Sequence, residues 1–118
     1  MLVYGFTEEK DGFMEIGDSL EAREKFVGGK LERTALTNDI DLISNSDSIR
    51  LGLEPRVIFH KNRKAINAFI LGDCFVCRRV DGDGVESIRK EDVEIIKERL
   101  FYLSSEKLRL LGILFLLS

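Results

Sequence analysis

The sequence predicts an α+β fold: one small domain over residues 1–118, with a mostly antiparallel sheet of about five to seven strands and two or three helices. Two patterns lead to this prediction. Short apolar or alternating runs bounded by turn residues recur along the chain, which is typical of strands joined by hairpins. Two other segments repeat apolar residues with the period of a helix. The length of 118 residues, with 44% hydrophobic and 33% charged residues, suits one ordinary core.

Two hairpins and a helix are predicted in the first part of the chain. Residues 2–16 form an opening hairpin around the turn signal Asp11-Gly12, and residues 30–44 form a second hairpin around Thr37-Asn38. Between them, residues 18–29 predict a short helix. Asp18 and Glu21 have the spacing of a capping box, and Gly28-Gly29 supplies the stop.

The second half of the chain begins with a less regular pattern. Residues 49–59 contain Pro55, which cannot donate to a sheet ladder, so an irregular or edge segment is expected there. Residues 65–80 form the longest strand-like run, with a bulge or kink indicated at Gly72-Asp73, and residues 80–88 predict a tight hairpin. From residue 89 a helix is expected to pack on the sheet through an apolar face of Val93, Ile96, Leu100 and Leu103.

The C-terminal element, residues 106–118, is unusually apolar. As a helix it would be roughly 20 Å long, which is short of the ~30 Å hydrocarbon core, so no membrane span is predicted. Three alternatives stay open: a buried final strand or helix, an element packed or swapped in a homodimer, and a weak membrane-surface anchor. A homodimer is expected, with candidate interface residues Leu110, Leu111, Ile113, Leu114, Phe115 and Leu117.

Catalytic and metal-binding sets are not found in the sequence. Cys74 and Cys77 have the spacing of half a zinc site, but a structural zinc site needs four ligands and His60 is the only histidine. The two thiols are therefore predicted to be unpaired and to pack on opposite faces of a strand. No catalytic dyad, metal or cofactor is expected, so the protein is predicted not to be an enzyme.

A basic segment, residues 56–64, stands out in a chain whose formal net charge is -3. It is predicted to be a loop, and Arg78-Arg79 could extend its positive surface. One alternative is a solvated loop without a binding role, and the other is a site for an acidic protein face or a phosphate-bearing ligand. The acidic net charge disfavours nucleic acid as a partner. With the adjacent turn, the candidate binding residues are Asn45, Arg50, Arg56, His60, Lys61, Arg63 and Lys64.

Several segments in order resemble a family of small proteins of unknown function from bacteriophages, plasmids and conjugative elements. The resemblance covers roughly residues 19–96 and implies an α+β fold and a mobile-element origin. Two features depart from it: the family's Asn between the Pro and the Arg is absent here, and the apolar C-terminus has no counterpart. The motifs are Val27-Gly28-Gly29 with Leu31-Glu32, then Asn45, Arg50-Leu51, Gly52-Leu53, Pro55 and Arg56, then Ile70-Leu71-Gly72, and finally Ser87-Ile88 with Glu91-Asp92.

Two functions are consistent with these features. The first is a non-enzymatic binding protein of a phage or mobile element that inhibits a host defence or regulatory protein. The alternative is a small-molecule binder that sequesters a nucleotide-type signal through residues 56–64. The N-terminal residues do not have the pattern of a signal peptide, so the cytoplasm of a bacterial host cell is the expected location.

Overall fold

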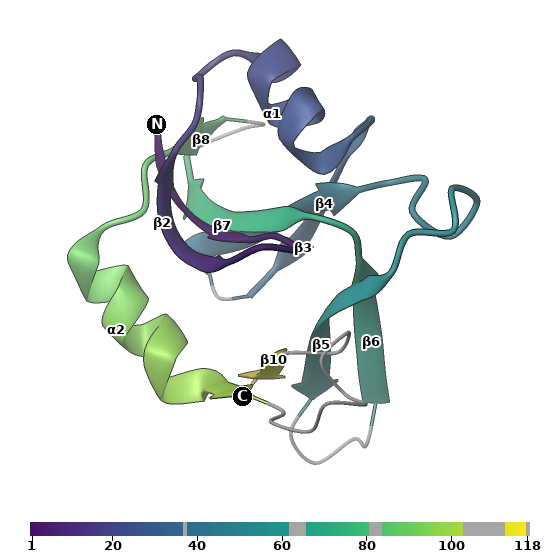
Figure 1. Cartoon of the computed structure of the whole chain (residues 1–118). Helices are drawn as coiled ribbons and strands as arrows, with labels where there is room; N and C mark the ends of the chain where they lie inside the picture. Colours follow the sequence, from purple (N-terminus) through teal and green to yellow (C-terminus); the bar gives the residue numbers. More distant parts are fainter. Residues whose placement is uncertain (37, 62–65, 81–83, 103–112, 118) are drawn as a thin grey trace.

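The strands of the computed structural model form two sheets (Figure 1). The structure describes residues 1–36, 38–61, 66–80, 84–102 and 113–117. For residues 55, 57–61, 66–69, 95–102 and 113–117 it describes the backbone only. The described elements are β1 (Leu2–Phe6), β2 (Asp11–Glu15), α1 (Leu20–Val27), β3 (Leu31–Ala35), β4 (Ile40–Asn45), β5 (Pro55–Lys61), β6 (Ile66–Leu71), β7 (Cys74–Arg79), β8 (Val85–Glu86), α2 (Lys90–Arg99), β9 (Leu100–Tyr102) and β10 (Ile113–Leu117).

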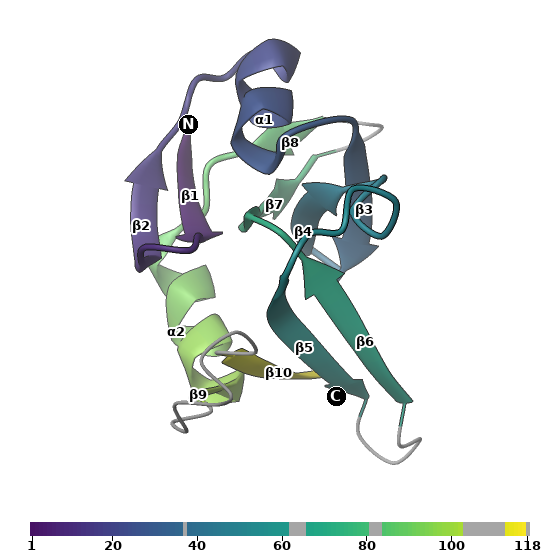
Figure 2. The ribbon, with the colours of Figure 1, turned by 45° about the vertical axis from the view of Figure 1, so that its right-hand side comes forward.

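The first sheet is antiparallel and six-stranded, in the order β2-β1-β7-β4-β3, with β8 paired to β7. Side chains alternate between its two faces, as the period of a strand requires. Tyr4, Leu42 and Val76 pack with Val93 of α2 on one face, and Val3, Ile43 and Phe75 pack with Val27 of α1 on the other. The two helices therefore cover opposite faces of this sheet (Figures 1 and 2). The predicted antiparallel sheet and two helices are confirmed in the described residues.

A second sheet of four strands, in the order β6-β5-β10-β9, was not expected. Its β5–β10 pair is parallel and its other two pairs are antiparallel. The reason lies at Gly72, whose φ of 80° turns the chain out of the extended conformation. The predicted run 65–80 is thereby divided into β6 and β7, which belong to different sheets.

The predicted hairpins and helices form, with small shifts at their ends. Asp11 and Gly12 lie inside β2 rather than in the turn, because the Thr7 hydroxyl and backbone amide both bond the Lys10 carbonyl and close the turn earlier. The cap of α1 is Ser19, not Asp18: the Ser19 hydroxyl accepts a hydrogen bond from the Ala22 amide at 3.1 Å. The helix ends as predicted, at Gly28 with φ 82°.

Most of the predicted basic loop is a strand, which corrects the sequence prediction. Pro55–Lys61 forms β5, which pairs with β6 on one side and β10 on the other, so it is not an edge strand either. Pro55 is tolerated because it is the first residue of the strand, where the missing N–H matters least. The expected irregularity is present as a register shift between Pro55 and Val57. Residues 62–65, which include Arg63 and Lys64, lie outside the described part of the chain.

The helix predicted from residue 89 is shorter than its expected apolar face, which reached Leu103. Helix α2 ends at Arg99, and Leu100 begins β9, opposite Phe115 of β10, because the chain here joins the second sheet. Val93 packs against the first sheet as predicted. Leu103, Leu110 and Leu111 lie outside the described residues. Among the helices that are described, none is long and apolar enough to cross a membrane.

The two cysteines are free and buried on opposite faces of β7, as the sequence predicts. Cys74 belongs to the cluster that includes Val93, and Cys77 belongs to the cluster that includes Val27. Burial is the main cause that raises the pKa of both thiols. At Cys77 the Asp41 carboxylate raises the pKa further, to about 12. Both thiols therefore stay protonated at neutral pH and act as small apolar side chains.

The Gly72 position gives a direct test of how the two sheets are joined. A Cβ on Gly72 would lie 2.6 Å from Leu53 Cδ1, whereas a Cβ on Gly52, which also has a positive φ, would meet no atom within 4 Å. Both Gly→Ala changes should cost roughly 1–2 kcal/mol for the left-handed backbone. We expect Gly72→Ala to lower the free energy of unfolding in urea by about 1–3 kcal/mol more than Gly52→Ala. Equal losses would show that Leu53 moves aside freely.

The homodimer stays a prediction, because a structure of a single chain does not test the oligomeric state. A substitution in the last strand, β10, can test it. Within the chain, Leu114 pairs with Ile58 and with Phe101, so β10 is a central strand. We expect the wild type to run as a dimer in size-exclusion chromatography with light scattering. Leu114→Asp should cost several kcal/mol and unfold the chain if this strand is core. A folded monomeric variant would place the strand at the dimer interface, and a wild-type monomer at tens of micromolar would refute the dimer.

Candidate functional site

Loop 46–54, which joins β4 to β5, is held in one conformation by hydrogen bonds. The amides of Leu51 and Leu53 each donate to the carbonyl of an earlier residue of the loop at 3.1 Å, and the Ser46 amide donates to the Lys30 carbonyl at 2.8 Å. Arg50 Nε donates to Asp47 Oδ2 at 2.6 Å. Because these bonds fix most of the backbone, little ordering remains to be done when the loop meets a partner.

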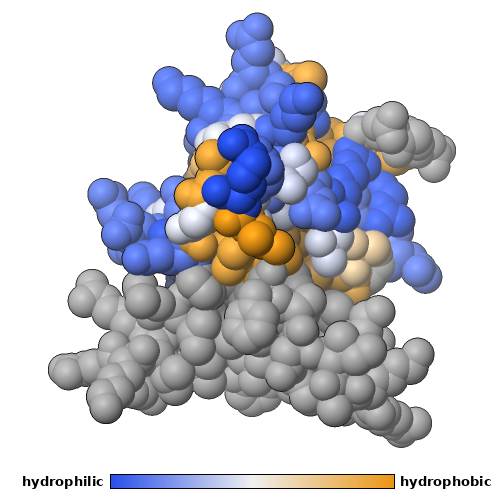
Figure 3. All heavy atoms as spheres, turned by 90° about the vertical axis from the view of Figure 1, so that its right-hand side faces the viewer, coloured by the Kyte–Doolittle hydropathy of each residue, from blue (hydrophilic) through white to orange (hydrophobic). Residues whose placement is uncertain are grey.

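The same loop exposes aliphatic side chains. Ile49 is 85% exposed and Leu51 is 46% exposed, and Ile49 is the most exposed of the large hydrophobic residues in the described part of the chain. The loop projects from the body of the protein in Figure 1, and Figure 3, which views that side, shows apolar atoms among strongly hydrophilic ones at the centre of the face. Two exposed aliphatic side chains close together on a hydrogen-bonded loop make this loop a candidate protein-binding surface.

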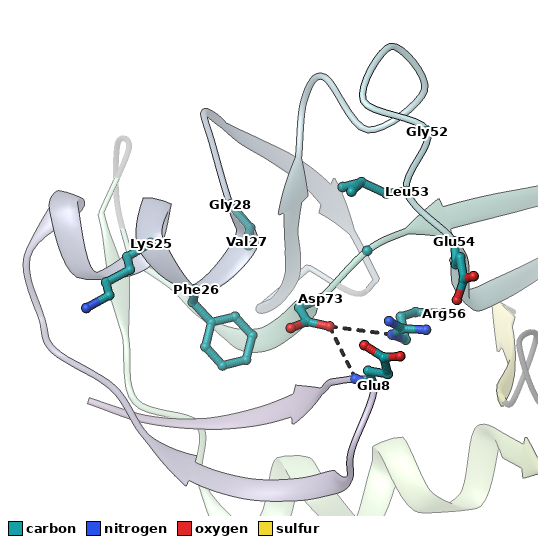
Figure 4. A pocket seen from close by; sticks show the side chains of 11 residues that line it. Glu8, Lys25, Phe26, Val27, Gly28, Gly52, Leu53, Glu54, Arg56 and Asp73 are labelled. Carbon is teal, nitrogen blue, oxygen red and sulfur yellow. Dashed lines mark hydrogen bonds and ion pairs between the residues drawn. The ribbon is translucent and has the colours of Figure 1, made fainter.

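Two hollows lie on either side of the loop. One, of about 510 Å³, is bounded by Gly28–Lys30 of the helix-to-strand step and by Asn45, Asp47, Arg50 and Leu51. The other, of about 530 Å³, is the cleft of Figure 4, between the end of α1, the segment 52–56, Gly72-Asp73 and Glu8 of the first turn. Both hollows are lined by residues of the loop and by Gly28, and we call the loop with its two hollows the loop face.

Arg56 is the central cation of the cleft. Its side chain is 14% exposed, and Arg56 Nε lies 3.5 Å from Asp73 Oδ1. The same Asp73 oxygen accepts a hydrogen bond from the Glu8 amide at 3.3 Å, so Asp73 links the first turn to β5 (Figure 4). Burial raises the pKa of the nearby Asp11 carboxyl, and the Arg56 cation partly opposes this shift. Arg56 is therefore ion-paired with Asp73, while its buried Nε has no hydrogen-bond partner among the described residues.

The candidate binding residues do not gather into one basic site. Asn45 is buried: its amide donates to the Val27 carbonyl at 3.0 Å, and its side-chain oxygen accepts the Asp47 amide at 2.7 Å. Arg50 is exposed and paired with Asp47, in the other hollow from Arg56. His60 and Lys61 belong to β5, and the structure describes only their backbone.

Arg78 and Arg79 do not extend a basic patch. Arg79 forms a two-nitrogen ion pair with the fully buried Asp41, and Arg78 Nη1 lies 2.5 Å from Asp92 Oδ1 at the start of α2. These hydrogen bonds raise the pKa of both guanidinium groups. Both cations are used to hold elements of the fold together.

Ile49, Glu8 and Asp73 are not among the binding residues that the sequence predicts. The signal for the loop was present in residues 49–53, where apolar residues alternate just before Pro55, but the same alternation also fits a strand. Glu8 and Asp73 meet only because two turns far apart in sequence are adjacent in the fold. Across the described residues, no group of three or more His, Cys, Asp or Glu side chains could hold a metal ion.

Comparison with known families finds one match. Residues 3–101 match the family described as Domain of unknown function (DUF3846), so the chain belongs to that family. The match extends beyond residues 19–96, over which the sequence resembles small proteins of unknown function. No curated protein and no solved structure matches the chain. Fold and family membership therefore leave the function to be inferred from the loop face.

Asn45 gives a test of how the loop face is held. We expect Asn45→Ala to lower the free energy of unfolding by about 2–3 kcal/mol, because it removes one buried and one partly buried hydrogen bond and leaves the Val27 carbonyl without that partner. The exposed Asn38→Ala is the matched control and should change it by about 0.5 kcal/mol or less. Chemical unfolding measures both. Similar values for the two variants would contradict a structural role for Asn45.

Proposed function

We propose that this member of the DUF3846 family is a non-enzymatic protein that binds another protein through its loop face. The observation that carries the proposal is loop 46–54, in which internal hydrogen bonds support an Ile49 side chain that is 85% exposed. Burial of an aliphatic side chain stabilises a protein or a complex by roughly 1.5–3 kcal/mol, and an exposed side chain does not contribute this free energy. Binding of a partner over the loop recovers that free energy.

The geometry of the loop face fits protein recognition better than capture of a small molecule. A small ligand is usually enclosed in a concave, mostly apolar pocket. Here the apolar groups are on a projecting loop with open hollows on both sides, which suits a partner surface that surrounds the loop. In such an interface the projecting side chain is the expected energetic centre, and the hollows receive side chains of the partner.

The proposal includes the biological setting that the sequence predicts. The partner would be a host defence or regulatory protein in the cytoplasm of a bacterial cell, and the chain would act as its inhibitor from a phage or another mobile element. The resemblance described above supports this setting. A rigid binding surface in a chain of 118 residues is sufficient for obstruction, which needs affinity and no turnover.

The alternative function, sequestration of a nucleotide-type signal, has one observation in its favour among the described residues: the buried Arg56 Nε beside the cleft has no hydrogen-bond partner. The other observations are against it. Among the described candidate residues, Arg56 is paired with Asp73, Arg50 is paired with Asp47, and Asn45 is buried in a structural role. A phosphate group would have to compete with those carboxylates for each guanidinium.

Ile49→Asp tests the proposed function. The change should alter stability by about 0.5 kcal/mol or less, because the side chain is already exposed. We expect proteins that tagged wild-type chain captures from a bacterial host lysate to be lost with Ile49→Asp, as identified by mass spectrometry. A charged group at the energetic centre of an interface would be left buried and unpaired.

Leu20→Asp is the matched control for this experiment. Leu20 is also exposed and aliphatic, but it lies at the start of α1, outside the loop face. The Leu20→Asp variant should capture the same proteins as the wild type. Identical capture by all three proteins would remove loop 46–54 from the binding site, and reproducible capture of nothing by the wild type would count against the proposed function itself.

A further inference from the structure

We infer that the cleft of Figure 4 receives a basic side chain, lysine or arginine, from the protein that binds the loop face; this inference rests on the proposed function. The cleft has a volume of about 530 Å³, which is ample for one long side chain. It shares Gly52 and Leu53 with loop 46–54, so a partner that covers Ile49 would reach it without a second binding site.

The balance of charge in the cleft favours a cation. Three carboxylates line it, from Glu8, Glu54 and Asp73, against the two cations Lys25 and Arg56. Arg56 Nε forms an ion pair with Asp73 Oδ1 at 3.5 Å but no hydrogen bond within the described residues, so Asp73 balances the Arg56 charge. In Figure 4 the Lys25 side chain points away from this group. Glu8 and Glu54 are both exposed, and within the described residues neither has an ion pair, so two carboxylates remain for an incoming positive charge.

The walls of the cleft favour a long basic side chain over a small cation or an anion. Phe26 and Leu53 line it together with the carboxylates, so it is apolar on one part and acidic on another. Lysine and arginine combine an aliphatic stem with a charged head, which matches this arrangement. An anionic ligand would meet the carboxylates of Glu8, Glu54 and Asp73. A metal ion would need ligands grouped around one point, and the described residues contain no such group.

The surface therefore specifies a partner with an apolar patch next to a basic residue. The apolar patch would cover Ile49 and Leu51, and the basic side chain would enter the cleft beside Leu53. The charge contact would mainly set which partner is accepted, and the aliphatic contact would supply most of the affinity.

The experiment is an NMR titration with defined probes. Acetyl-leucyl-arginine amide is added to the ¹⁵N-labelled full chain, and the amide signals of Gly52, Gly72 and Asp73 are followed. Acetyl-leucyl-citrulline amide is the neutral control of nearly the same shape, and inorganic pyrophosphate is the anionic probe. We expect saturable shifts at these amides from the arginine probe that weaken with added salt. The neutral probe should bind several-fold more weakly, and pyrophosphate should give no shifts at these amides.

Variants identify the carboxylates that are responsible. Glu8→Gln combined with Glu54→Gln should weaken binding of the arginine probe about fivefold to tenfold, since each exposed ion pair contributes modestly. Glu9→Gln combined with Glu32→Gln removes the same charge from two exposed positions outside the cleft and should leave binding nearly unchanged. The amide spectra also show directly that each variant is folded.

Three outcomes would overturn the inference: cleft shifts from pyrophosphate but not from the arginine probe, equal binding to both double variants, or no cleft shifts from any probe. The lysate experiment separates this failure from failure of the proposed function. If Ile49→Asp loses the captured proteins while Glu8→Gln with Glu54→Gln retains them, the loop binds a protein and the cleft does not receive its basic side chain. Loss with both variants supports the inference.

Discussion

The turn at Gly72 is the constraint on which the arrangement of the molecule depends. Its left-handed backbone ends β6 and starts β7, so that one continuous run of apolar sequence serves two sheets. The Gly72 amide donates to the Glu54 carbonyl at 2.7 Å, which ties the turn to the segment before β5. The absence of a side chain lets Leu53 pack directly against the turn. The cleft is the space that this junction leaves beside α1.

Most of the described arginines serve the fold, which changes how the basic character of the chain should be interpreted. Arg79 and Arg33 contact the fully buried Asp41, Arg78 contacts Asp92, and Arg56 contacts Asp73. A buried carboxylate without such a partner would be costly, so these pairs are needed once the acidic groups lie inside. Among the described candidates, Arg56, Arg78 and Arg79 are therefore paired with carboxylates of the fold.

The loop face combines rigidity with unsatisfied apolar surface. Asn45 links the end of α1 to the start of loop 46–54, and the bonds within the loop hold Ile49 outward. Ordering a flexible loop on binding costs free energy for each side chain and backbone unit that is fixed. In this protein the backbone bonds of the loop are already formed in the folded chain, so the proposed binding through Ile49 and Leu51 would carry less of that cost.

The sequence by itself determined the local structure of the chain. Alternation predicted both hairpins and the β7–β8 pair, helical period predicted α1 and α2, and the Gly28 stop and the Gly72 kink were both indicated by residue type. These features depend on neighbours within a few residues, for which the period of apolar residues and the preferences of glycine are sufficient. The burial of the two thiols on opposite faces followed from the same reasoning.

Only the tertiary structure decided how those elements combine. Two sheets instead of one, the central place of β5 and the position of Arg56 depend on pairings between residues far apart in sequence, such as β5 with β10. A basic residue looks the same in a sequence whether it is free or paired, and its state was decided by carboxylates such as Asp73 and Asp92 that folding brings beside it. Exposure of Ile49 was likewise undetermined, because an aliphatic residue between turns can point inward or outward until the surrounding elements are in place.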